Sequence, residues 1–314
     1  MSHRVAVLMG GPSAEAEVSR SSAREVATAL QAAGHQPTLV ELDRYTAGRL
    51  LDDAPDVVFP ALHGPPGEDG TVQGFLEILG FPYVGSGVHG SAAAMDKSIA
   101  KSVFLRAGLP VADDLIFAHG TDAASAEAEI LESLGDRVVI KPLRQGSAIG
   151  VTRIANAGDL KAGLAAALAL GDGVLVEPYV LGREITVGVL DLHEEAPVVF
   201  PVIEIRTAPD QWYDYTNRYA KGASEHIIPA RLADTQNETL QQIALTAHRA
   251  LSLRDLSRAD FIVTDDDRIV LLEVNTLPGM TPTSLFPDGA QALGIDFPTL
   301  VDRLVRSALD RYRS

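Results

Sequence analysis

Four polar side chains alternate with apolar residues on two neighbouring runs near the carboxyl-terminal end of the chain. Arg258 and Asp260 lie in the first run, and Glu273 and Asn275 lie in the second. The acidic segment 264–268 between the runs predicts a β-hairpin. With a loop of two or four residues, Asp260 would lie opposite Glu273, and Arg258 opposite Asn275. Because side chains two positions apart share one face of a strand, all four are expected to converge.

Two opposed carboxylates, with Cβ atoms about 4.5–5.5 Å apart, would repel each other inside an apolar sheet. A positive charge is therefore expected between Asp260 and Glu273. Carboxylate and amide oxygens suit Mg²⁺ or Mn²⁺, and Mg²⁺ is usually held by one or two carboxylates together with nucleotide phosphates. The alternative is a solvent-facing acidic strand pair, which the apolar neighbours Phe261 and Val274 disfavour. The sequence therefore predicts a divalent-metal site on this hairpin.

Composition excludes several classes of function. The chain has 314 residues, no cysteine and a formal net charge of -16 at pH 7. The length allows two or three domains, and the negative charge argues against a nucleic-acid partner, because phosphate backbones are bound by basic surfaces. Without cysteine there is no disulfide, thiolate metal ligand or cysteine nucleophile. We find no signal-peptide core and no apolar run of about 18 residues, so a soluble, cytoplasmic protein with no membrane partner is predicted.

The elements that must position these residues alternate between apolar strands and alanine-rich helices. Strand 5–9 ends at a glycine turn, a helix follows over 13–33, and further strands are predicted at 38–42 and 57–62. This βαβ opening predicts a parallel sheet, in which ligands lie beyond the carboxyl ends of the strands.

A second set of elements begins after a helix predicted over 91–105, where Pro110 breaks the pattern. Strands 138–141 and 151–154 flank a glycine-rich loop, and a helix followed by the strand 174–177 completes a small α+β unit. The hairpin and the final helices form the rest of the chain. Three domains are expected, covering residues 1–90, 91–180 and 181–314.

Two of the loops carry candidate nucleotide-binding residues. Gly146–Gly150 would present backbone N–H groups to phosphate oxygens, with a simple tight turn as the alternative. The loop lacks G-x-x-x-x-G-K-[ST], so a P-loop enzyme is disfavoured. Lys141 ends the preceding strand, where it either reaches phosphates or is an ordinary surface lysine. Glu177 ends another strand, where it either accepts from an adenine amino group or ribose hydroxyls or merely caps the strand.

The first turn, Gly10–Glu15, invites a dinucleotide interpretation but lacks G-x-G-x-x-G. Pro12 and Glu15 stand where a pyrophosphate requires bare N–H groups, so a nicotinamide site is discounted. On local grounds Glu15 is best explained as an acid placed favourably at a helix start. A carboxylate there could equally hold a substrate ammonium.

Motifs along almost the whole chain resemble, in order, those of the D-alanine:D-alanine ligases of the ATP-grasp superfamily. The matching segments are 10–19, 62–64, 67–70, 95–97, 141–142, 146–150, 213–215 with Tyr219, 258–260 and 273–285. The resemblance implies an ATP-grasp fold of mixed α/β and α+β class. Its parts would be an N-terminal parallel-sheet domain, a small central α+β domain and a C-terminal antiparallel-sheet domain.

The same resemblance implies a reaction. The carboxylate of one D-alanine would attack the γ-phosphate of ATP, and the amine of a second D-alanine would attack the resulting acyl phosphate. The products would be ADP, phosphate and D-alanyl-D-alanine, a peptidoglycan precursor.

The resemblance also assigns residues to the nucleotide and metal sites. The expected ATP contacts are Lys97, Lys141, Gly146, Ser147, Glu177, Glu184 and Arg218. Two Mg²⁺ or Mn²⁺ ions would be held by Asp260, Glu273 and Asn275, and a monovalent cation is left open as a further cofactor. Arg258 and the Gly279 N–H would stabilise the tetrahedral oxyanion.

Substrate contacts follow from the same resemblance. Glu15 would hold the ammonium of the first D-alanine, with His63 nearby, and Ser147 and Tyr219 would hydrogen-bond to Glu15. The carboxylate of the second D-alanine would be bound by Ser284 and the Leu285 N–H. The segment 212–229 resembles a mobile lid, whose Tyr219 is typical of dipeptide-forming ligases, so D-alanine is predicted as the second substrate. Family members are typically homodimers.

Three positions depart from the family pattern. Arg218 stands where a lysine is common, Ala148 where a second serine is frequent, and Ala16 where an arginine is common. These departures bear on nucleotide affinity and lid closure. One alternative function is another ATP-grasp carboxylate–amine ligase with a different amino-acid or hydroxy-acid acceptor. The other is a catalytically silent nucleotide-binding protein, which the intact Arg258 and hairpin acids disfavour.

Overall fold

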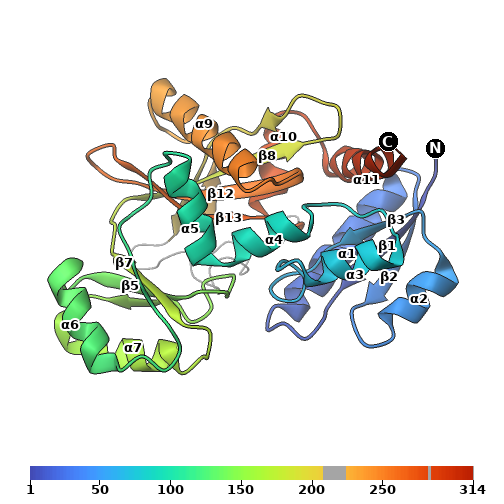
Figure 1. Cartoon of the computed structure of the whole chain (residues 1–314). Coiled ribbons are helices and arrows are strands. Elements are labelled where there is room, and N and C mark those ends of the chain that lie inside the picture. Colours follow the sequence, from blue (N-terminus) through green and yellow to red (C-terminus); the bar gives the residue numbers. More distant parts are fainter. Residues whose placement is uncertain (208–223, 282–283, 314) are drawn as a thin grey trace.

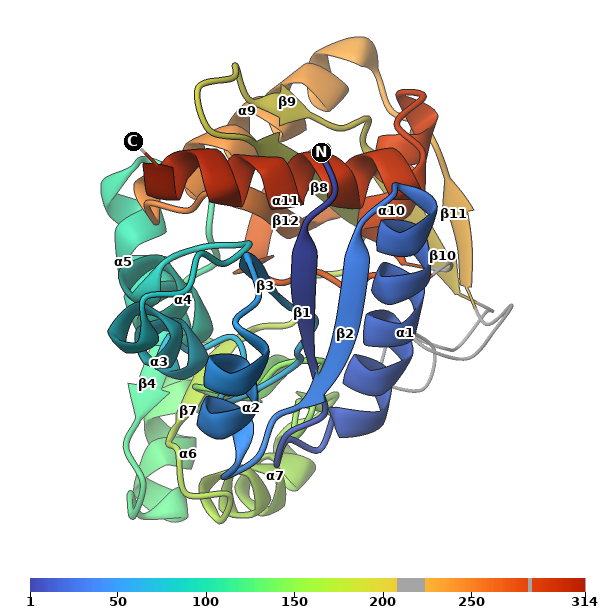
Figure 2. The ribbon, with the colours of Figure 1, turned by 90° about the vertical axis from the view of Figure 1, so that its right-hand side faces the viewer.

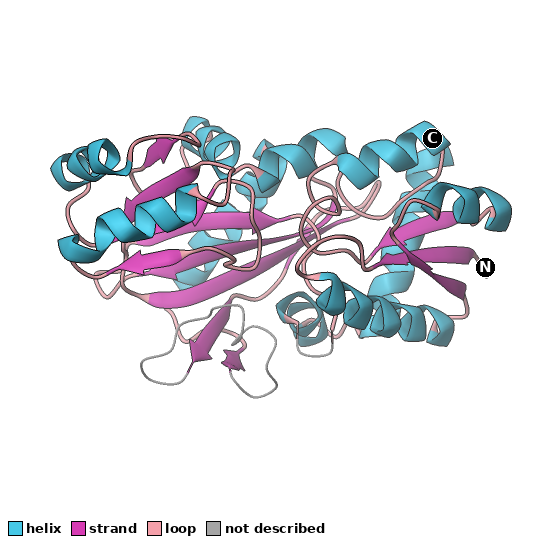
Figure 3. Cartoon of the chain, turned by 90° about the horizontal axis from the view of Figure 1, so that it is seen from below, coloured by secondary structure: helices cyan, strands magenta, loops and turns pink. Residues whose placement is uncertain are grey.

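The computed structural model describes residues 1–207, 224–281 and 284–313, and these residues form one parallel and two antiparallel sheets (Figure 1). This mixed architecture confirms the fold class expected from the sequence. Viewed from below, the parallel sheet lies at one end of the molecule and the largest sheet runs toward it (Figure 3). In the described residues, none of the helices has both the length and the apolar character needed to cross a membrane.

The N-terminal sheet is parallel, in the order β2-β1-β3, as its βαβ pattern predicted (Figure 2). Its elements are β1 (Arg4–Met9), α1 (Ala16–Ala32), β2 (Gln36–Glu41), α2 (Thr46–Asp53), β3 (Val57–Pro60) and α3 (Thr71–Leu79). Successive residues of β1 point to opposite faces, so Val5 and Val7 lie in one apolar core, while Ala6 and Leu8 lie in another. Both faces are therefore covered, and the site must lie at the strand ends.

The central sheet is antiparallel, in the order β4-β7-β5-β6. Its elements are β4 (Leu115–Phe117), α6 (Ala123–Ser133), β5 (Val138–Pro142), β6 (Thr152–Ile154), the 3₁₀ turn η1 (Ala157–Asp159), α7 (Leu160–Leu168) and β7 (Val174–Pro178). Val138, Ile140, Val174 and Val176 pack with residues of α6 and α7 in one core. Alternation along the strands then sends Lys141 and Glu177 to the opposite face.

The C-terminal sheet is also antiparallel, in the order β11-β10-β8-β12-β13, with β9 beside β8. Its elements are β8 (Arg183–Asp191), β9 (Val198–Val199), β10 (Ile203–Thr207), β11 (Ser224–Ile227), α9 (Asp234–Ala250), β12 (Asp255–Val263), β13 (Ile269–Asn275) and α10 (Leu285–Ala292). One face packs on α9 through residues such as Val187, Ala259 and Phe261. The other face carries the polar residues of the hairpin.

The helix predicted over 91–105 is in fact two helices, α4 (Val88–Met95) and α5 (Lys97–Arg106). Asp96 separates them because its backbone is extended, with φ -84° and ψ 106°. Its carboxylate accepts from the N–H groups of Ser98 at 3.0 Å and Ile99 at 3.3 Å, which is an N-cap for α5. The break makes Lys97 the first residue of α5.

Two helices pack away from their neighbours in sequence. In α5, Ala100 and Phe104 belong to the core of the C-terminal sheet, although the central sheet follows α5 along the chain. The final helix, α11 (Phe297–Arg313), packs through Leu300 and Leu304 into the core of the N-terminal sheet. These helices connect the three sheets across their boundaries. The domain limits at residues 90 and 180 stay predictions.

Candidate active site

The hairpin of β12 and β13 has the predicted pairing, with Asp260 opposite Glu273 and Arg258 opposite Asn275. The expected loop length was wrong, because Val263 pairs with Ile269 and the loop 264–268 between them has an odd number of residues.

A β-bulge restores the register that an odd loop would otherwise shift. Phe261 pairs with Leu271 while Asp260 pairs with Glu273, so Leu272 has no partner on β12. Leu271 and Val274 lie in the apolar core, whereas Leu272 and Glu273 both line the pocket on the opposite face. The bulge therefore turns two successive side chains toward the same site.

Asp260 lies at the centre of a hydrogen-bond network on this face. Arg258 donates to both carboxylate oxygens, from Nε to Oδ1 at 2.8 Å and from Nη2 to Oδ2 at 2.7 Å. The amide of Asn275 donates to Oδ2 at 3.1 Å, and the hydroxyl of Thr186 donates to Oδ1 at 2.6 Å. The predicted convergence of Arg258, Asp260 and Asn275 is confirmed, and Thr186 on β8 is an additional member.

The protein's own cations supply the positive charge that was expected between the two acids. Arg258 pairs with Asp260, and the Nζ of Lys97 lies 3.9 Å from Oε2 of Glu273. The argument from repulsion alone therefore does not require a metal. The donor set is nevertheless the type that Mg²⁺ takes, since it combines two carboxylates with an amide whose oxygen stays available when its nitrogen donates.

In the described parts of the chain, no three His, Asp or Glu side chains form a group that could hold a metal ion. Asp260, Glu273 and Asn275 would thus need further ligands from phosphate oxygens and water to complete a coordination sphere, which is the usual arrangement for Mg²⁺. The residues fit a metal that arrives with a nucleotide.

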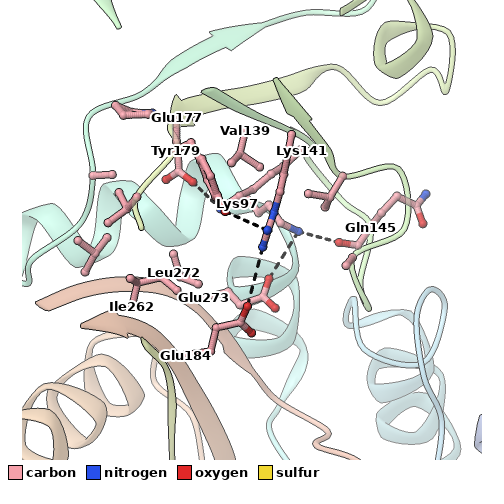
Figure 4. Close-up of a pocket in the computed structure, with 17 residues that line it drawn as sticks. Lys97, Val139, Lys141, Gln145, Glu177, Tyr179, Glu184, Ile262, Leu272 and Glu273 are labelled. Atoms are coloured by element: carbon pink, nitrogen blue, oxygen red, sulfur yellow. Dashed lines mark hydrogen bonds and ion pairs between the residues drawn. The ribbon is translucent and has the colours of Figure 1, made fainter. Parts of the chain in front are cut away.

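A pocket lies between the central sheet and the C-terminal sheet (Figure 4). Lys97, Lys141, Glu177 and Glu184 all line it, so four of the expected ATP contacts share one space. Its apolar walls come from both sheets and include Val139, Val151, Ile262, Val270 and Leu272. A pocket with apolar residues from both sheets and charged groups in its lining suits a flat ring that carries a phosphate chain.

The lysines and glutamates of this pocket have polar partners within the protein, and Glu184 lies 3.8 Å from Arg153. Lys141 donates to Oε2 of Glu177, and Lys97 donates from Nζ to the backbone oxygen of Gln145 at 2.6 Å. Burial disfavours the charged lysine, but the carboxylate of Glu177 outweighs it and raises the pKa of Lys141. Lys141 is therefore a charged ammonium whose side chain is only 14% exposed, and not a surface lysine.

Glu15 is the N-cap residue of α1, as a helix-start acid would be, but its side chain makes no capping hydrogen bond. It is buried, and it accepts a hydrogen bond at Oε1 from the hydroxyl of Ser147 in the glycine-rich loop. This bond was expected from the family resemblance. The explanation of Glu15 as a helix-terminal acid is thus too simple, since its carboxylate joins the N-terminal unit to the central one.

The glycine-rich loop forms a tight turn between β5 and β6. Ser147 and Ala148 have φ values of 47° and 58°, and the N–H of Ile149 donates to the oxygen of Gly146 at 3.0 Å. Two central residues in the left-handed region are typical of a type I′ hairpin turn. Gly146 lies beside Glu68, Lys97, Glu273 and Asn275 around a small cavity next to the main pocket.

Two residues on the loop that follows β3 have shifted pKa values. His63 is buried, with Nε2 at 3.1 Å from the hydroxyl of Ser22, and burial together with the charge of Arg258 lowers its pKa to about 4. Glu68 accepts from the Gly64 N–H at 2.6 Å, and burial together with the charge of Glu15 raises its pKa to about 8. At neutral pH the imidazole is thus neutral and the Glu68 carboxyl is mostly protonated.

This loop approaches Glu15 closely because residue 64 is a glycine. Gly64 has φ 67°, and a Cβ there would lie 2.8 Å from Oε2 of Glu15 and 2.5 Å from the hydroxyl of Ser13. A side chain at this position would therefore push the acid away and strain the backbone.

The expected acceptor site lies at the start of α10. Ser284 is the N-cap residue, and its hydroxyl accepts from the N–H of Thr281 at 3.0 Å. A Cβ at Gly279 would lie 2.8 Å from the same hydroxyl, so the two segments touch. The N–H of Leu285 is at the positive end of a helix, where a carboxylate is favoured.

Two of the candidate residues, Arg218 and Tyr219, and most of the segment 212–229 lie outside the described residues. Sequence reasoning also missed functional candidates that the structure brings forward. Lys101 is buried and donates to Oε1 of Glu177, and Glu68 belongs to a quoted motif without having been given a role. For Lys101 a signal was present, because a lysine four residues after Lys97 shares its helix face.

Known proteins are similar to almost the whole chain. The family described as D-ala D-ala ligase C-terminus matches residues 103–306, and D-ala D-ala ligase N-terminus matches residues 45–86. A D-alanine–D-alanine ligase of Moorella thermoacetica is 45% identical over 310 residues, which are 98% of this chain and 99% of that protein.

Solved structures are similar over the same extent. The D-alanine–D-alanine ligase of Bacillus anthracis complexed with ATP has a TM-score of 0.84 at 30% identity, covering 99% of both chains. The VanG D-Ala:D-Ser ligase of Enterococcus faecalis has a TM-score of 0.83 at 30% identity, covering 98% of this chain and 100% of that one. Neighbours at this level of similarity thus include proteins named for two different second substrates.

Proposed function

Because the chain belongs to the D-alanine–D-alanine ligase family, we propose that it joins two D-alanine molecules at the expense of ATP, in the site where its three sheets meet. The observation that carries the assignment of the site is the shared pocket of Lys97, Lys141, Glu177 and Glu184. The product, D-alanyl-D-alanine, is a precursor of peptidoglycan.

ATP lies with its base between the apolar walls of the pocket and its phosphates toward the ammonium groups. Ile262 and Leu272 from the C-terminal sheet and Val139 from the central sheet supply flat apolar contact. Lys97 and Lys141 place positive charge where the phosphate chain passes, which favours the anion in a site of low dielectric constant. Backbone N–H groups of the Gly146–Gly150 turn add neutral donors.

Asp260, Glu273 and Asn275 would supply oxygen ligands for two divalent ions, Mg²⁺ or Mn²⁺. When bound, such ions neutralise the triphosphate and the charge that develops during phosphoryl transfer. Arg258 holds Asp260 by two hydrogen bonds, and the family resemblance assigns its guanidinium to the oxyanion of the tetrahedral intermediate. Together with the Gly279 N–H, it stabilises that oxyanion.

The first D-alanine binds near Glu15 and His63. Glu15 accepts from Ser147 and keeps lone pairs for a substrate ammonium. Since Glu68 is mostly protonated at neutral pH, it does not add a second full negative charge beside Glu15. His63 is neutral there and contributes polarity without repelling the ammonium.

The second D-alanine binds with its carboxylate at the start of α10, near Ser284 and Leu285. The helix N-terminus and the serine hydroxyl attract the carboxylate and direct the amine toward the acyl group of the first substrate. Tyr219 and Arg218 join the site from the lid, as the family resemblance implies.

The test is a purified-protein assay that measures ADP release and identifies the product by mass spectrometry. ADP and D-alanyl-D-alanine are expected with ATP, Mg²⁺ and D-alanine alone. The second candidate is a ligase with another acceptor, which the similarity to the D-Ala:D-Ser ligase favours. ADP release that requires D-serine or D-lactate in addition to D-alanine would support that candidate and contradict the first.

Three further expectations depend on the same family membership. A homodimer is expected, and sedimentation equilibrium would test it. A cytoplasmic location is expected because the reaction consumes ATP, and fractionation of cells would test it. Activation by a monovalent cation would appear as a difference between potassium and tetramethylammonium salts in the ADP assay.

A further inference from the structure

A buried lysine lies behind the wall of the nucleotide pocket. Lys101 is on α5 and is 6% exposed, which is rare for a lysine unless its charge is paired. Its Nζ donates to Oε1 of Glu177 and lies 3.0 Å from Oδ1 of Asp114. It also borders a small cavity together with Lys141 and Glu177. The proposed mechanism gives Lys101 no contact with substrate.

Glu177 is held by ammonium groups on both of its oxygens. Lys101 donates to Oε1 and Lys141 donates to Oε2. Burial opposes ionisation of this carboxyl, but the charges of Lys141 and Lys101 prevail and lower its pKa. A carboxylate offers about four acceptor positions, so two lysines fix its orientation and leave acceptor capacity toward the pocket.

The contact also joins two separate cores. Ala100 and Phe104, on the same helix as Lys101, pack in the core of the C-terminal sheet, whereas Glu177 lies on β7 of the central sheet. The pocket lies between these two sheets. Lys101 therefore positions the Glu177 carboxylate of the central sheet from α5, a helix that packs on the C-terminal sheet.

We propose that Lys101 is a positioning residue for base recognition, which fixes the Glu177 carboxylate so that it accepts from the 6-amino group of adenine and disfavours guanine. The inference rests on the proposed function in that ATP occupies this pocket. Guanine presents a 6-oxo acceptor, which a fixed carboxylate repels, and a site built around one hydrogen bond discriminates strongly against a ligand that lacks it. A loosely held carboxylate would turn away and lose that discrimination.

The experiment compares three single variants of the full chain. Lys101→Met removes the ammonium and keeps the length of the side chain. Asp114→Asn weakens the other ion pair of Lys101 and leaves Glu177 alone. Lys161→Met changes an exposed lysine on α7 and serves as the matched control. For each, steady-state kinetics with ATP, GTP and D-alanine give kcat and both KM values, and thermal unfolding gives the rise in Tm caused by each nucleotide.

For Lys101→Met we expect the KM for ATP to rise about tenfold or more, as supporting residues of a site typically do when removed. The ratio of kcat/KM for ATP to that for GTP should fall, while the KM for D-alanine changes by less than about twofold. Asp114→Asn and Lys161→Met should keep the wild-type ratio. The ATP-induced rise in Tm should shrink in Lys101→Met and not in Lys161→Met.

Two results would overturn the inference. The first is an unchanged ratio of kcat/KM for ATP to that for GTP in a folded Lys101→Met. The second is an equal fall of this ratio in Asp114→Asn, which would mean that Lys101 only links the sheets. If Lys101→Met does not fold, Lys101→Gln keeps a donor without the charge and must show the same smaller rise in Tm with ATP. The Tm measurements need no amino acid. A wild type that binds ATP but does not ligate D-alanine would therefore refute the proposed function and leave this test intact.

Discussion

The two walls of the nucleotide pocket carry different balances of charge. On the central sheet, Glu177 is matched by Lys141 and by Lys101 behind it, so the negative group has positive partners on both oxygens. On the C-terminal sheet, Asp260 has Arg258, whereas the cation nearest to Glu273 among the described residues is Lys97, at 3.9 Å. The negative charge of the first wall is balanced by lysines of the protein itself. The second wall carries negative charge that a bound cation can neutralise.

The excess of acid grows toward the N-terminal sheet. Burial raises the pKa of Glu68 most, and the charges of Glu15 and Glu273 raise it further. Carboxylates thus gather where a substrate ammonium and divalent ions are proposed to bind, and lysines gather where phosphates are proposed to bind. The first wall therefore binds an anion and its base, whereas the second wall attracts cations that neutralise its negative charge.

The largest effect should come from removing an acid of the second wall. Asp260→Asn or Glu273→Gln should lower kcat by about a thousandfold, because the negative charge that a divalent ion requires is lost. The exposed Asp265 in the hairpin loop provides the matched control, and Asp265→Asn should keep full activity. Chelation of divalent ions should abolish ADP release by the wild type, and addition of Mg²⁺ should restore it. Activity that survives EDTA would show that the second wall needs no metal.

The next effect concerns the first wall. Lys141→Met leaves Glu177 with Lys101 as its remaining cation, so the fold should lose about 1–3 kcal/mol of unfolding free energy and not more. The KM for ATP should rise by about a hundredfold, because a buried ammonium that faces the phosphates is gone. Urea unfolding and ADP-release kinetics measure the two quantities. If only stability changed, the assignment of Lys141 to ATP would be wrong.

The hairpin shows how much of the site is predictable from sequence. Side-chain alternation alone brought Asp260 and Asn275 to one face, because the period of a strand is fixed by its geometry. The loop parity was wrong, and the correct pairing survived because a bulge at Leu272 compensates. Bulges depend on how a strand packs in its sheet, so the sequence pattern gives no direct sign of them.

Other features depended on contacts between distant segments. The helix break at Asp96 had a visible capping residue, but helix-forming neighbours on both sides concealed it. Lys101 was overlooked because its partner, Glu177, is far away in sequence, and only the packing of α5 on the C-terminal core brings them together. Local chemistry was therefore predictable, whereas pairing between sheets was not.

A smaller effect should come from the link between the walls and the N-terminal unit. Ser147→Ala removes the hydroxyl that donates to Glu15, and the KM for the first D-alanine should rise about tenfold, as expected for one hydrogen bond to a charged group. The KM for ATP should change less. Ser102→Ala, at an exposed position of α5, is the control. An equal rise in both KM values would indicate that Ser147 supports the glycine-rich loop instead of Glu15.

The smallest effect is a pH dependence of stability caused by Glu68, one of the clustered acids. Its pKa is about 8 in the folded chain against an ordinary value of 4.5. The folded chain therefore keeps a proton that the unfolded chain releases, and the free energy of unfolding must fall as the pH rises from the lower to the higher value. Below the ordinary pKa both states are protonated, and this contribution to stability is fully present.

Glu68→Gln removes that titration without changing the shape of the side chain. The stability of the wild type minus that of Glu68→Gln should therefore decrease by more than about 1 kcal/mol between pH 5 and pH 8 in ligand-free protein. Glu129→Gln, at an exposed position of α6, should show no such trend. Urea unfolding at several pH values measures the difference. A constant difference would mean that Glu68 is already ionised over this pH range, and the loop after β3 would then place a full negative charge beside Glu15.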